Sequence, residues 1–463
     1  MSIIKSISGI RGTIGGKPGD GLGAVDIVRY ASSFAELLKR YNPEKNTIVV
    51  GRDARLSGEM AEKLVVGALM AMGFDVVNIG LATTPTTELA VIGLKAAGGV
   101  IITASHNPKQ WNALKLLGGD GEFISDEMGK EVLRIAENDD FVYAEVEDLG
   151  KEYHDDTWLS RHIDMICQLP LVDVEAIRSR QFNIAVDAIN SVGGIAIPKL
   201  LKSLGVNNII EINCEPNGKF AHNPEPIPEN LYEISDFIKS NNDIDLGIVV
   251  DPDVDRLALV MENGEMFVEE YTLVSVADYV LSNRKGSAVS NLSSSRALSD
   301  ICKLHGCDYY ASAVGEVNVV KKMKEKIAVI GGEGNGGVIY PELHYGRDAL
   351  VGVALFLTAL AKSGFKMTEW KKLLPEYHIS KNKINLSDNL DVDALLRKIK
   401  EHYSDEKITD IDGVKIDFKN GWVHLRKSNT EPIIRIYSEA STKEEAEDMA
   451  TKVKEIIAAL SNT

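Results

Sequence analysis

The strongest constraint on the fold is a weak internal repeat that occurs three times along the chain. Each copy has an apolar, strand-like run that ends in a polar loop, then a helical stretch closed by glycine, then a second strand-like run. The first strands of the three copies end near Asp53, Asp187 and Asn291. A strand–helix–strand unit requires a mostly parallel sheet with helices on its faces. The repeat therefore predicts three similar mixed α/β domains in series.

The last part of the chain has a different pattern. Asp412 and Asn420 each precede a glycine, which is typical of tight hairpin turns, and apolar strands follow them. Residues 442–460 form a charged amphipathic pattern that predicts a closing helix. We therefore expect a C-terminal α+β domain. The expected domain ranges are 1–151, 152–255, 256–375 and 376–463.

Charge and hydropathy exclude several classes of partner. The chain has 68 acidic and 51 basic residues, for a formal net charge of −17, so we expect no nucleic-acid partner. The longest apolar run, 349–361, is shorter than the roughly 20 residues that span a bilayer, which predicts a buried helix and no membrane segment. The N-terminus lacks a signal pattern, and four cysteines are too few for a disulfide framework. We expect a cytoplasmic protein.

The first of four polar loops is the serine loop, residues 103–108. It follows the apolar run 100–102, so Ser105 lies where a strand ends. Ligands of open α/β sheets gather at the carboxyl ends of strands. Ser, Asn and Pro are also common turn residues, so an ordinary polar turn remains open for this loop alone. The absence of a Gly-x-Ser-x-Gly elbow disfavours an acyl-transfer hydrolase.

The metal loop, residues 251–256, contains three alternating aspartates after the apolar run 246–250. Asp251, Asp253 and Asp255 would repel one another strongly unless a cation is bound. Hard oxygen ligands suit Mg²⁺, which phosphate oxygen or water typically completes. A solvated acidic turn is one alternative. A phosphatase in which Asp251 acts as the nucleophile is another.

The other two loops present polar groups to a ligand. The glycine loop, residues 332–337, fits G-x-G-x-x-G, but a strand-like run follows it, so no helix N-terminus is available for a pyrophosphate. It is better interpreted as presenting Glu333 and Asn335 to sugar hydroxyls. The arginine loop, residues 426–432, combines cations, hydroxyls and backbone N–H groups, which suits a phosphate, although a charged surface turn remains open.

Together, in this order along the chain, the four loops resemble those of the α-D-phosphohexomutase superfamily. The sequence TASHNP at 103–108 is the most specific match, DPDVDR at 251–256 is less specific, and GEGNGG at 332–337 is weak alone. Members of this superfamily move a phosphoryl group between the 1 and 6 positions of hexoses. The resemblance implies three domains of one α/β fold and a flexible fourth domain around a central cleft, with one loop in each domain.

The resemblance also implies roles for individual residues. Ser105 is similar to the serine that carries the phosphoryl group and contacts the metal. The implied Mg²⁺ ligands are Asp251, Asp253 and Asp255, and the implied cations beside the phosphoserine are Arg11, Lys115 and Arg256. The residues expected at the sugar are Glu333, Asn335 and Glu316. Those expected at the distal phosphate are Arg426, Ser428, Asn429, Thr430 and Arg435.

Charge governs the chemistry that these residues would perform. A phosphoserine carries about −1.5 to −2 charges, which must be offset before an anionic sugar phosphate can react with it. Mg²⁺, Lys115 and Arg256 can supply that offset. The expected cofactors are Mg²⁺ and phosphoserine at Ser105, with a hexose 1,6-bisphosphate as intermediate or activator. Lys115 is the candidate general base, a role that requires a lowered pKa.

Departures from the family pattern bear on the sugar. Asn335 and Gly337 stand where many bacterial relatives have Ser and His. In the metal loop, Pro252 and Val254 replace glycine or alanine. Glu316 follows Val-Gly where gluco/manno-type enzymes often have Thr-Gly-His, a form similar to phosphoglucosamine mutases.

A carboxylate near a protonated 2-amino group is favourable, although Glu316 could instead cap a helix or contact backbone. We predict a phosphoglucosamine mutase, with a dual-specificity phosphoglucomutase/phosphomannomutase as the alternative. A phosphatase and a non-catalytic sugar-phosphate sensor are hypotheses from other classes. The expected partner is a phosphosugar, and the expected assembly is a monomer or homodimer.

Overall fold

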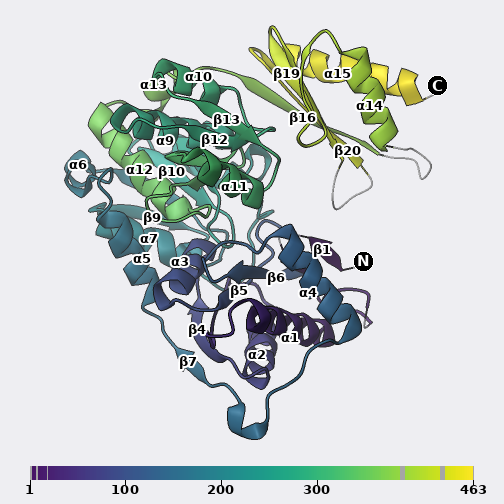
Figure 1. Cartoon of the computed structure of the whole chain (residues 1–463). Coiled ribbons are helices and arrows are strands. Elements are labelled where there is room, and N and C mark those ends of the chain that lie inside the picture. Colours follow the sequence, from purple (N-terminus) through teal and green to yellow (C-terminus); the bar gives the residue numbers. More distant parts are fainter. Residues whose placement is uncertain (1–2, 7–8, 18, 386–391, 428–432, 462–463) are drawn as a thin grey trace.

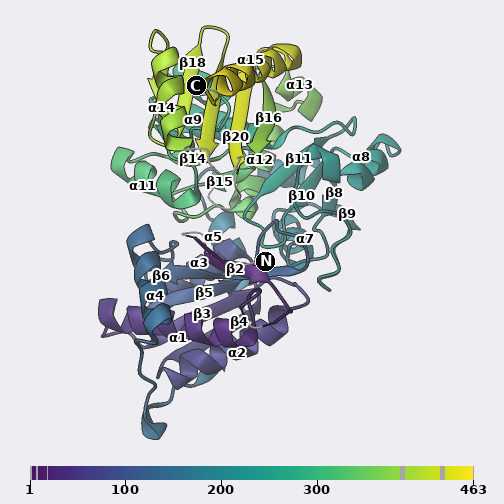
Figure 2. The same ribbon diagram turned by 90° about the vertical axis from the view of Figure 1, so that its right-hand side faces the viewer.

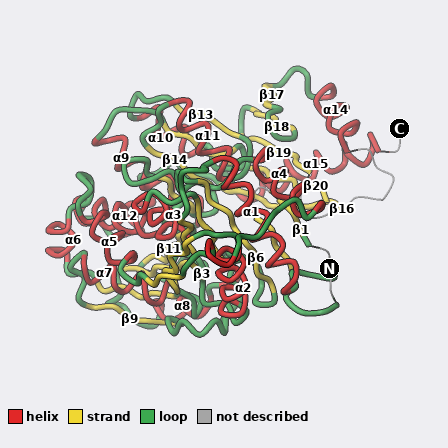
Figure 3. The backbone as a smooth tube through the Cα atoms, turned by 60° about the horizontal axis from the view of Figure 1, so that its bottom comes forward, coloured by secondary structure: helices red, strands yellow, loops and turns green. Residues whose placement is uncertain are grey.

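The computed structural model describes residues 3–6, 9–17, 19–385, 392–427 and 433–461. Helices and strands are interspersed through residues 24–371 (Figure 3). The described strands form four sheets, of which three are mixed and one is antiparallel. The predicted α/β class with four domains is confirmed.

The first domain is built on a seven-stranded sheet in the order β1-β2-β6-β5-β3-β4-β7. Its strands are β1 (Ile4–Ser6), β2 (Gly9–Thr13), β3 (Thr47–Arg52), β4 (Asp75–Leu81), β5 (Gly98–Ile102), β6 (Trp111–Gly118) and β7 (Glu152–His154). Its helices are α1 (Ala24–Tyr41), α2 (Gly58–Ala71), α3 (Thr84–Leu94) and α4 (Asp126–Asn138). Successive residues of a strand point to opposite faces, so Ile48 and Val50 pack with α1 and α2 while Val49 packs with α3.

The second and third domains each contain a four-stranded sheet. The second sheet, β11-β10-β8-β9, comprises β8 (Asn183–Asp187), β9 (Asn208–Ile212), β10 (Leu246–Val250) and β11 (Leu257–Met261). The third, β13-β12-β14-β15, comprises β12 (Ala288–Asn291), β13 (Tyr309–Ser312), β14 (Ile330–Glu333) and β15 (Gly337–Ile339). The helices of this region are α5 (Trp158–Cys167), α6 (Val174–Arg180), α7 (Gly193–Ser203), α8 (Tyr232–Lys239), α9 (Glu269–Asn283), α10 (Ala297–Leu304), α11 (Glu316–Lys326), α12 (Ala349–Ser363) and α13 (Met367–Lys371).

One continuous hydrophobic core joins the second and third domains. Helix α12, which contains the longest apolar run of the sequence, is buried and contacts α5, α6 and α7 as well as α9. Leu200 of α7 and Phe356 of α12 belong to the same cluster of buried side chains. The run is therefore a buried helix, and no helix among the described residues is long and apolar enough to cross a membrane.

Two sheets extend past the predicted domain ranges. Strand β7 pairs with β4 of the first sheet, beyond residue 151, and β11 pairs with β10 of the second sheet, beyond residue 255. The repeated sequence pattern does not predict β7 or β11. The β7 strand is three exposed residues long, and β11 returns antiparallel directly after the metal loop rather than through a crossover helix.

The C-terminal domain is an antiparallel sheet in the order β16-β20-β19-β18-β17, covered on one face by two helices. Its strands are β16 (His378–Asn385), β17 (Lys407–Thr409), β18 (Val414–Phe418), β19 (Gly421–Lys427) and β20 (Ile433–Ala440), and its helices are α14 (Val392–His402) and α15 (Lys443–Ser461). This domain lies beside the third domain and apart from α1 and α2 of the first (Figures 1 and 2).

Hydrogen bonds connect the C-terminal sheet to the third domain. His424 contacts Ser293 Oγ through Nδ1 at 2.9 Å, and the backbone N–H of Val314 donates to Asp412 Oδ2 at 2.9 Å. Lys415 Nζ donates to the carbonyl of Leu292 at 2.8 Å. The face of the sheet that carries His424 is therefore turned toward the third domain, while Val423 and Leu425 pack beneath α14 and α15.

Candidate active site

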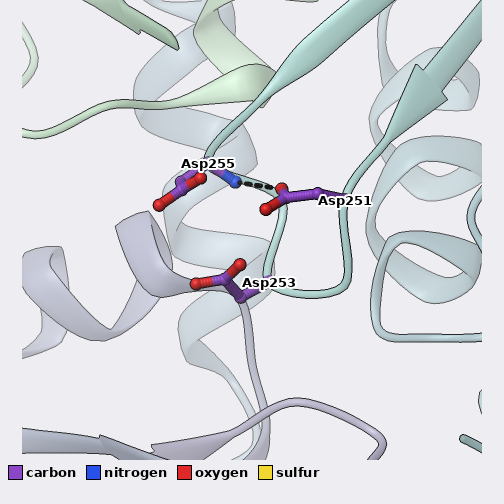
Figure 4. Close-up of side chains that lie close together, drawn as sticks. All are labelled: Asp251, Asp253 and Asp255. Carbon is purple, nitrogen blue, oxygen red and sulfur yellow. Dashed lines mark hydrogen bonds between the residues drawn. The ribbon is translucent and has the colours of Figure 1, made fainter. Parts of the chain in front are cut away.

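The three aspartates of the metal loop form a buried cluster after β10 (Figure 4). One carboxylate oxygen from each of Asp251, Asp253 and Asp255 lies within 4.8 Å of the others. Asp251 Oδ1 accepts hydrogen bonds from the backbone N–H groups of Asp255 and Arg256, both at 3.1 Å. Val254 adopts φ = 62°, a strained conformation for a β-branched residue, and strain of this kind is concentrated at functional sites.

The donor set of this cluster fits a hard divalent cation. Among the described residues, Asp253 Oδ1 and Asp255 Oδ1 are buried carboxylate oxygens without a hydrogen bond. Burial and the neighbouring charges of Asp255 and Asp253 raise the pKa of Asp251 well above its ordinary value. A bound cation would satisfy the two oxygens and relieve the repulsion. Oxygen ligands of this number and charge suit Mg²⁺.

Ser105 lies directly against this cluster. Its Oγ donates a hydrogen bond of 2.7 Å to Asp251 Oδ2, and its backbone adopts φ = 46° in the left-handed region. The backbone N–H of Ser105 donates to Thr103 Oγ1 at 2.9 Å. The structure therefore brings together the serine loop after β5 and the metal loop after β10, as the sequence predicts.

Lys115 on β6 points into the same cluster. Its Nζ lies 2.7 Å from Asp253 Oδ2 and 3.4 Å from Asp255 Oδ2. Burial lowers the pKa of Lys115, but the carboxylates of Asp253 and Asp255 outweigh burial, so the pKa is raised. This direction is opposite to the one that a general base needs. In this arrangement Lys115 is a fixed positive charge.

Arg11, Arg256 and His106 contact the serine loop or the metal loop. Arg11 Nη1 donates to Asn107 Oδ1 of the serine loop at 3.1 Å. Arg256 Nε lies 3.9 Å from Asp255 Oδ1. His106 Nδ1 lies 3.3 Å from Ser105 Oγ, and burial, with the charges of Arg256 and Arg11, lowers the pKa of His106 well below its ordinary value. His106 is therefore neutral. His106 belongs to the serine loop, but no feature of the sequence assigned it a role.

Arg55 is a site residue that the sequence argument missed. Its buried guanidinium donates to the carbonyls of Ser105, Asn107 (2.7 Å), Pro108 (2.9 Å) and Trp111 (3.0 Å). A pair with Asp53 at 3.0 Å fixes the guanidinium. Arg55 therefore holds the backbone of the serine loop. The available signal was its position in a polar loop that ends a neighbouring strand, at the same edge of the sheet.

The glycine loop places Glu333 in a hydrogen-bonded setting rather than an open one. Glu333 Oε1 accepts from Asn291 Nδ2 at 2.8 Å and from the backbone N–H of Gly315 at 3.0 Å, and Oε2 accepts from Arg347 Nη1 at 2.8 Å. Asn335 Oδ1 accepts from the N–H of Gly337 at 3.2 Å, which closes the loop on itself.

Glu316 makes the backbone contact that the sequence left open as the alternative to a sugar contact. It begins helix α11, and its two carboxylate oxygens accept from the backbone N–H and from Nε of Arg347, both at 3.0 Å. The carboxylate expected beside a sugar ammonium is thus already paired with a guanidinium. Arg347 could not be identified from the sequence, because its partners come from three separate segments.

In the C-terminal domain, Arg426 lies directly opposite Arg435 in the pairing of β19 with β20. On the other side of β20, Lys383 of β16 lies directly opposite Arg435. Side chains at directly paired positions share a face, and like charges there are destabilising unless an anion binds them. Arg426 Nη1 lies 3.9 Å from Asp412 Oδ2. Three further residues predicted at this site lie outside the described residues: Ser428, Asn429 and Thr430.

Comparisons with known proteins agree with this architecture. Models of phosphoglucomutase/phosphomannomutase α/β/α domains I, II and III match residues 3–143, 160–264 and 269–377, and the C-terminal domain model matches residues 383–456. A phosphoglucomutase/phosphomannomutase of Thermococcus kodakarensis is 37% identical over 91% of this chain and 92% of its own. A phosphoglucosamine/phosphogalactosamine mutase of Sulfurisphaera tokodaii is 34% identical over 89% of this chain and 92% of its own.

Solved structures show the same fold. A phosphoglucomutase/phosphomannomutase family protein of Burkholderia thailandensis superposes with a TM-score of 0.85 at 24% identity, covering 98% of this chain and 97% of its own. An N-acetylphosphoglucosamine mutase of Aspergillus fumigatus, solved with GlcNAc-6P and magnesium, gives a TM-score of 0.58 at 15% identity, covering 100% of this chain and 96% of its own. From the four domain matches and the relatives, the chain belongs to the phosphoglucomutase/phosphomannomutase family of the α-D-phosphohexomutase superfamily.

Proposed function

We propose that this phosphohexomutase interconverts glucosamine 6-phosphate and glucosamine 1-phosphate through a phosphoserine at residue 105. The observation that carries the phosphoserine mechanism is the 2.7 Å hydrogen bond from Ser105 Oγ to Asp251 Oδ2, while the choice of an amino sugar is supported by the name of the Sulfurisphaera relative. It places the hydroxyl on a buried cluster of aspartates suited to Mg²⁺. A phosphoryl group on Ser105 would lie at the metal site and among cationic side chains.

The proposed reaction makes and breaks one phosphorus–oxygen bond in each half. The C1 hydroxyl of the 6-phosphate attacks the phosphoryl group of phospho-Ser105, the bond from phosphorus to Oγ breaks, and the proton of the C1 hydroxyl passes to Ser105 Oγ. The product is a 1,6-bisphosphate, which turns over within the site. Ser105 Oγ then attacks the 6-phosphoryl group, the bond from phosphorus to the C6 oxygen breaks, and the proton of Oγ passes to the released C6 oxygen.

The chain's own residues offset charge and position the reacting groups. When bound, Mg²⁺ would supply charge neutralisation at the phosphoryl oxygens, held by Asp251, Asp253 and Asp255. Lys115 and Arg256 add fixed positive charge, and phosphoryl transfer depends chiefly on such positioning and electrostatics. The contacts of Lys115 Nζ with the carboxylates of Asp253 and Asp255 support this role. His106, neutral and 3.3 Å from Ser105 Oγ, is a second candidate for handling the serine proton.

We assign the phosphate that is not reacting to the basic row formed by Lys383, Arg435 and Arg426. Their direct pairing across β16, β20 and β19 gathers three cations on one face of the sheet. Asp412 connects this row to the third domain, because it accepts from the N–H of Val314 and lies near Arg426.

Arg426→Ala should raise KM for both phosphosugar isomers by about 10- to 100-fold, the effect of losing one charge-assisted hydrogen bond. Ser105 should still become phosphorylated, because the substitution leaves the catalytic cluster intact. Steady-state kinetics and intact-mass analysis would measure the two effects. Arg397→Ala is the matched control, since Arg397 is exposed on α14, which covers the other face of the sheet. An unchanged KM for both isomers would place the distal phosphate elsewhere.

A dual-specificity phosphoglucomutase/phosphomannomutase is the second candidate. The name of the Sulfurisphaera relative supports an amino sugar, whereas the Thermococcus relative supports glucose and mannose. The pairing of Glu316 with Arg347 also favours the second candidate, because it removes the carboxylate expected to select a 2-ammonium group. Comparing kcat/KM for glucosamine, glucose and mannose phosphates would decide between the two.

Glu316→Gln should lower kcat/KM for glucosamine and glucose phosphates by similar factors. The amide would place an N–H group against one of the Arg347 donors, and a buried unsatisfied donor costs about 1–3 kcal/mol. We therefore expect losses of roughly 5- to 100-fold on both sugars. A selective loss with glucosamine phosphate would instead show that Glu316 pairs directly with the 2-ammonium group.

A further inference from the structure

Arg347, in the segment between β15 and α12, is a buried side chain that the proposed mechanism does not use. Its guanidinium donates through Nε to Glu316 Oε2 at 3.0 Å, through Nη1 to Glu333 Oε2 at 2.8 Å and through Nη2 to Asp255 Oδ2 at 2.8 Å. One buried cation therefore joins the start of α11, the glycine loop and the metal loop.

The two carboxylate oxygens of Asp255, an expected metal ligand, have different surroundings. Arg347 and Lys115 both hold Oδ2 of Asp255, which leaves Oδ1 buried and without a hydrogen bond. Asp253 shows the same division, because Thr84 Oγ1 and Lys115 Nζ donate to its Oδ2 at 2.6 and 2.7 Å while its Oδ1 has no hydrogen bond. Groups that hold the outer oxygens of metal ligands orient the inner ones toward the metal.

Gly337 provides the space in which Arg347 makes these contacts. A Cβ atom at residue 337 would lie 2.3 Å from Cδ and 3.0 Å from Cγ of Arg347. The backbone of Gly337 does not adopt a positive φ, so only the close approach requires glycine here. Any larger residue at this position would displace the guanidinium from its three carboxylates.

We propose that Arg347 is a positioning residue that fixes Asp255 for the metal and Glu333 for the sugar at the same time. Metal binding and sugar binding then depend on one guanidinium, and a displacement of Arg347 weakens both. This inference rests on the proposed function, because it takes the metal loop as the Mg²⁺ site and Glu333 as a sugar contact.

The first test replaces Arg347 with lysine, which keeps the charge but cannot reach three carboxylates. Loss of such a supporting contact costs about 10- to 100-fold in metal affinity or activity. Arg347→Lys should raise the half-saturating Mg²⁺ concentration by about tenfold or more and should raise KM for the phosphosugar. Mg²⁺ affinity is measured without turnover, as the Mg²⁺ dependence of Tm. Arg284→Lys is the control, since Arg284 pairs with Glu342 at the surface of the same domain.

The second test moves Arg347 without changing any charged group. Gly337→Ala should shift Mg²⁺ affinity and KM in the same direction as Arg347→Lys, because the added Cβ displaces the guanidinium. Gly129→Ala, in helix α4 where a Cβ meets nothing within 4 Å, should change neither. The two substitutions are independent, so a folding failure of one leaves the other to decide.

The outcomes separate positioning from other roles. If both variants lower Tm without Mg²⁺ but keep wild-type Mg²⁺ affinity and KM, Arg347 is only structural and the proposal is overturned. A change in KM with wild-type Mg²⁺ affinity would likewise overturn it. If the wild-type protein isomerises none of the phosphosugars, the proposed function fails. The Mg²⁺ dependence of Tm in the variants still tests whether Arg347 positions the metal ligand.

Discussion

Ser105→Ala should abolish mutase activity, with kcat lower by a factor on the order of 10³ or more, the scale on which removal of a covalent nucleophile acts. The reason is that Ser105 is the hydroxyl hydrogen-bonded to the Asp251 carboxylate in the metal cluster. Intact-mass and peptide analysis should find the wild-type protein partly phosphorylated at this residue and the variant unphosphorylated. Substrate binding, measured by calorimetry, should persist because the other contacts remain.

Two results would contradict this assignment. Full mutase activity in Ser105→Ala would exclude a phosphoserine mechanism. A phosphoryl group that remains in the variant and is labile to acid would indicate an aspartyl phosphate on Asp251, as in the phosphatase hypothesis. Ser240→Ala is a suitable control, because the hydroxyl of Ser240, at the end of α8, donates to the local backbone carbonyl of Asp236.

Removal of Mg²⁺ should lower mutase activity nearly as much as the Ser105→Ala substitution does. Chelation with EDTA should abolish phosphoryl transfer, and added Mg²⁺ should restore it, because the buried aspartates and the phosphoryl group would otherwise repel one another. Asp253→Asn should lower the rate and raise the Mg²⁺ requirement, since Asp253 supplies one of the two buried carboxylate oxygens of the metal loop that lack a hydrogen bond. Exposed Asp236, on α8 of the same domain, provides the control Asp236→Asn. An unchanged rate of phosphoryl transfer after EDTA treatment would show that the metal loop has only a structural role.

Local patterns in the sequence predicted the parts of the site that are themselves local. Ser105 and Asp251 each follow an apolar strand, which predicts that each lies at the carboxyl end of its own sheet. The two strands belong to different sheets, and only the resemblance to the family implied that their loops meet. The same reasoning predicted the buried helix at 349–361, because a long apolar run excludes an exposed position.

Contacts between distant segments were beyond the sequence argument. The partners of Arg347 depend on how α11, the glycine loop and the metal loop lie relative to one another. The spacing of residues within a single segment cannot predict that arrangement. Glu316 was expected to face the sugar because its other partner was unknown. Lys383 could be placed in the basic row only from the register of β16 against β20. The pattern of residues within a strand does not determine that register.

The interface between the C-terminal sheet and the third domain contains polar hydrogen bonds. This has a consequence for how the bisphosphate can turn over. Contacts such as those of His424 with Ser293 and of Asp412 with Val314 are hydrogen bonds that water can replace, and each net exchange costs about 0.5–1.5 kcal/mol. Separating a shared apolar core, such as the one that joins the second and third domains, would be far more costly. The fold thus places a polar interface, which water can enter, next to Arg426 and Arg435. Under the proposed assignment of the distal phosphate to these residues, separation of this interface would release that phosphate while Ser105 and the aspartates keep their contacts.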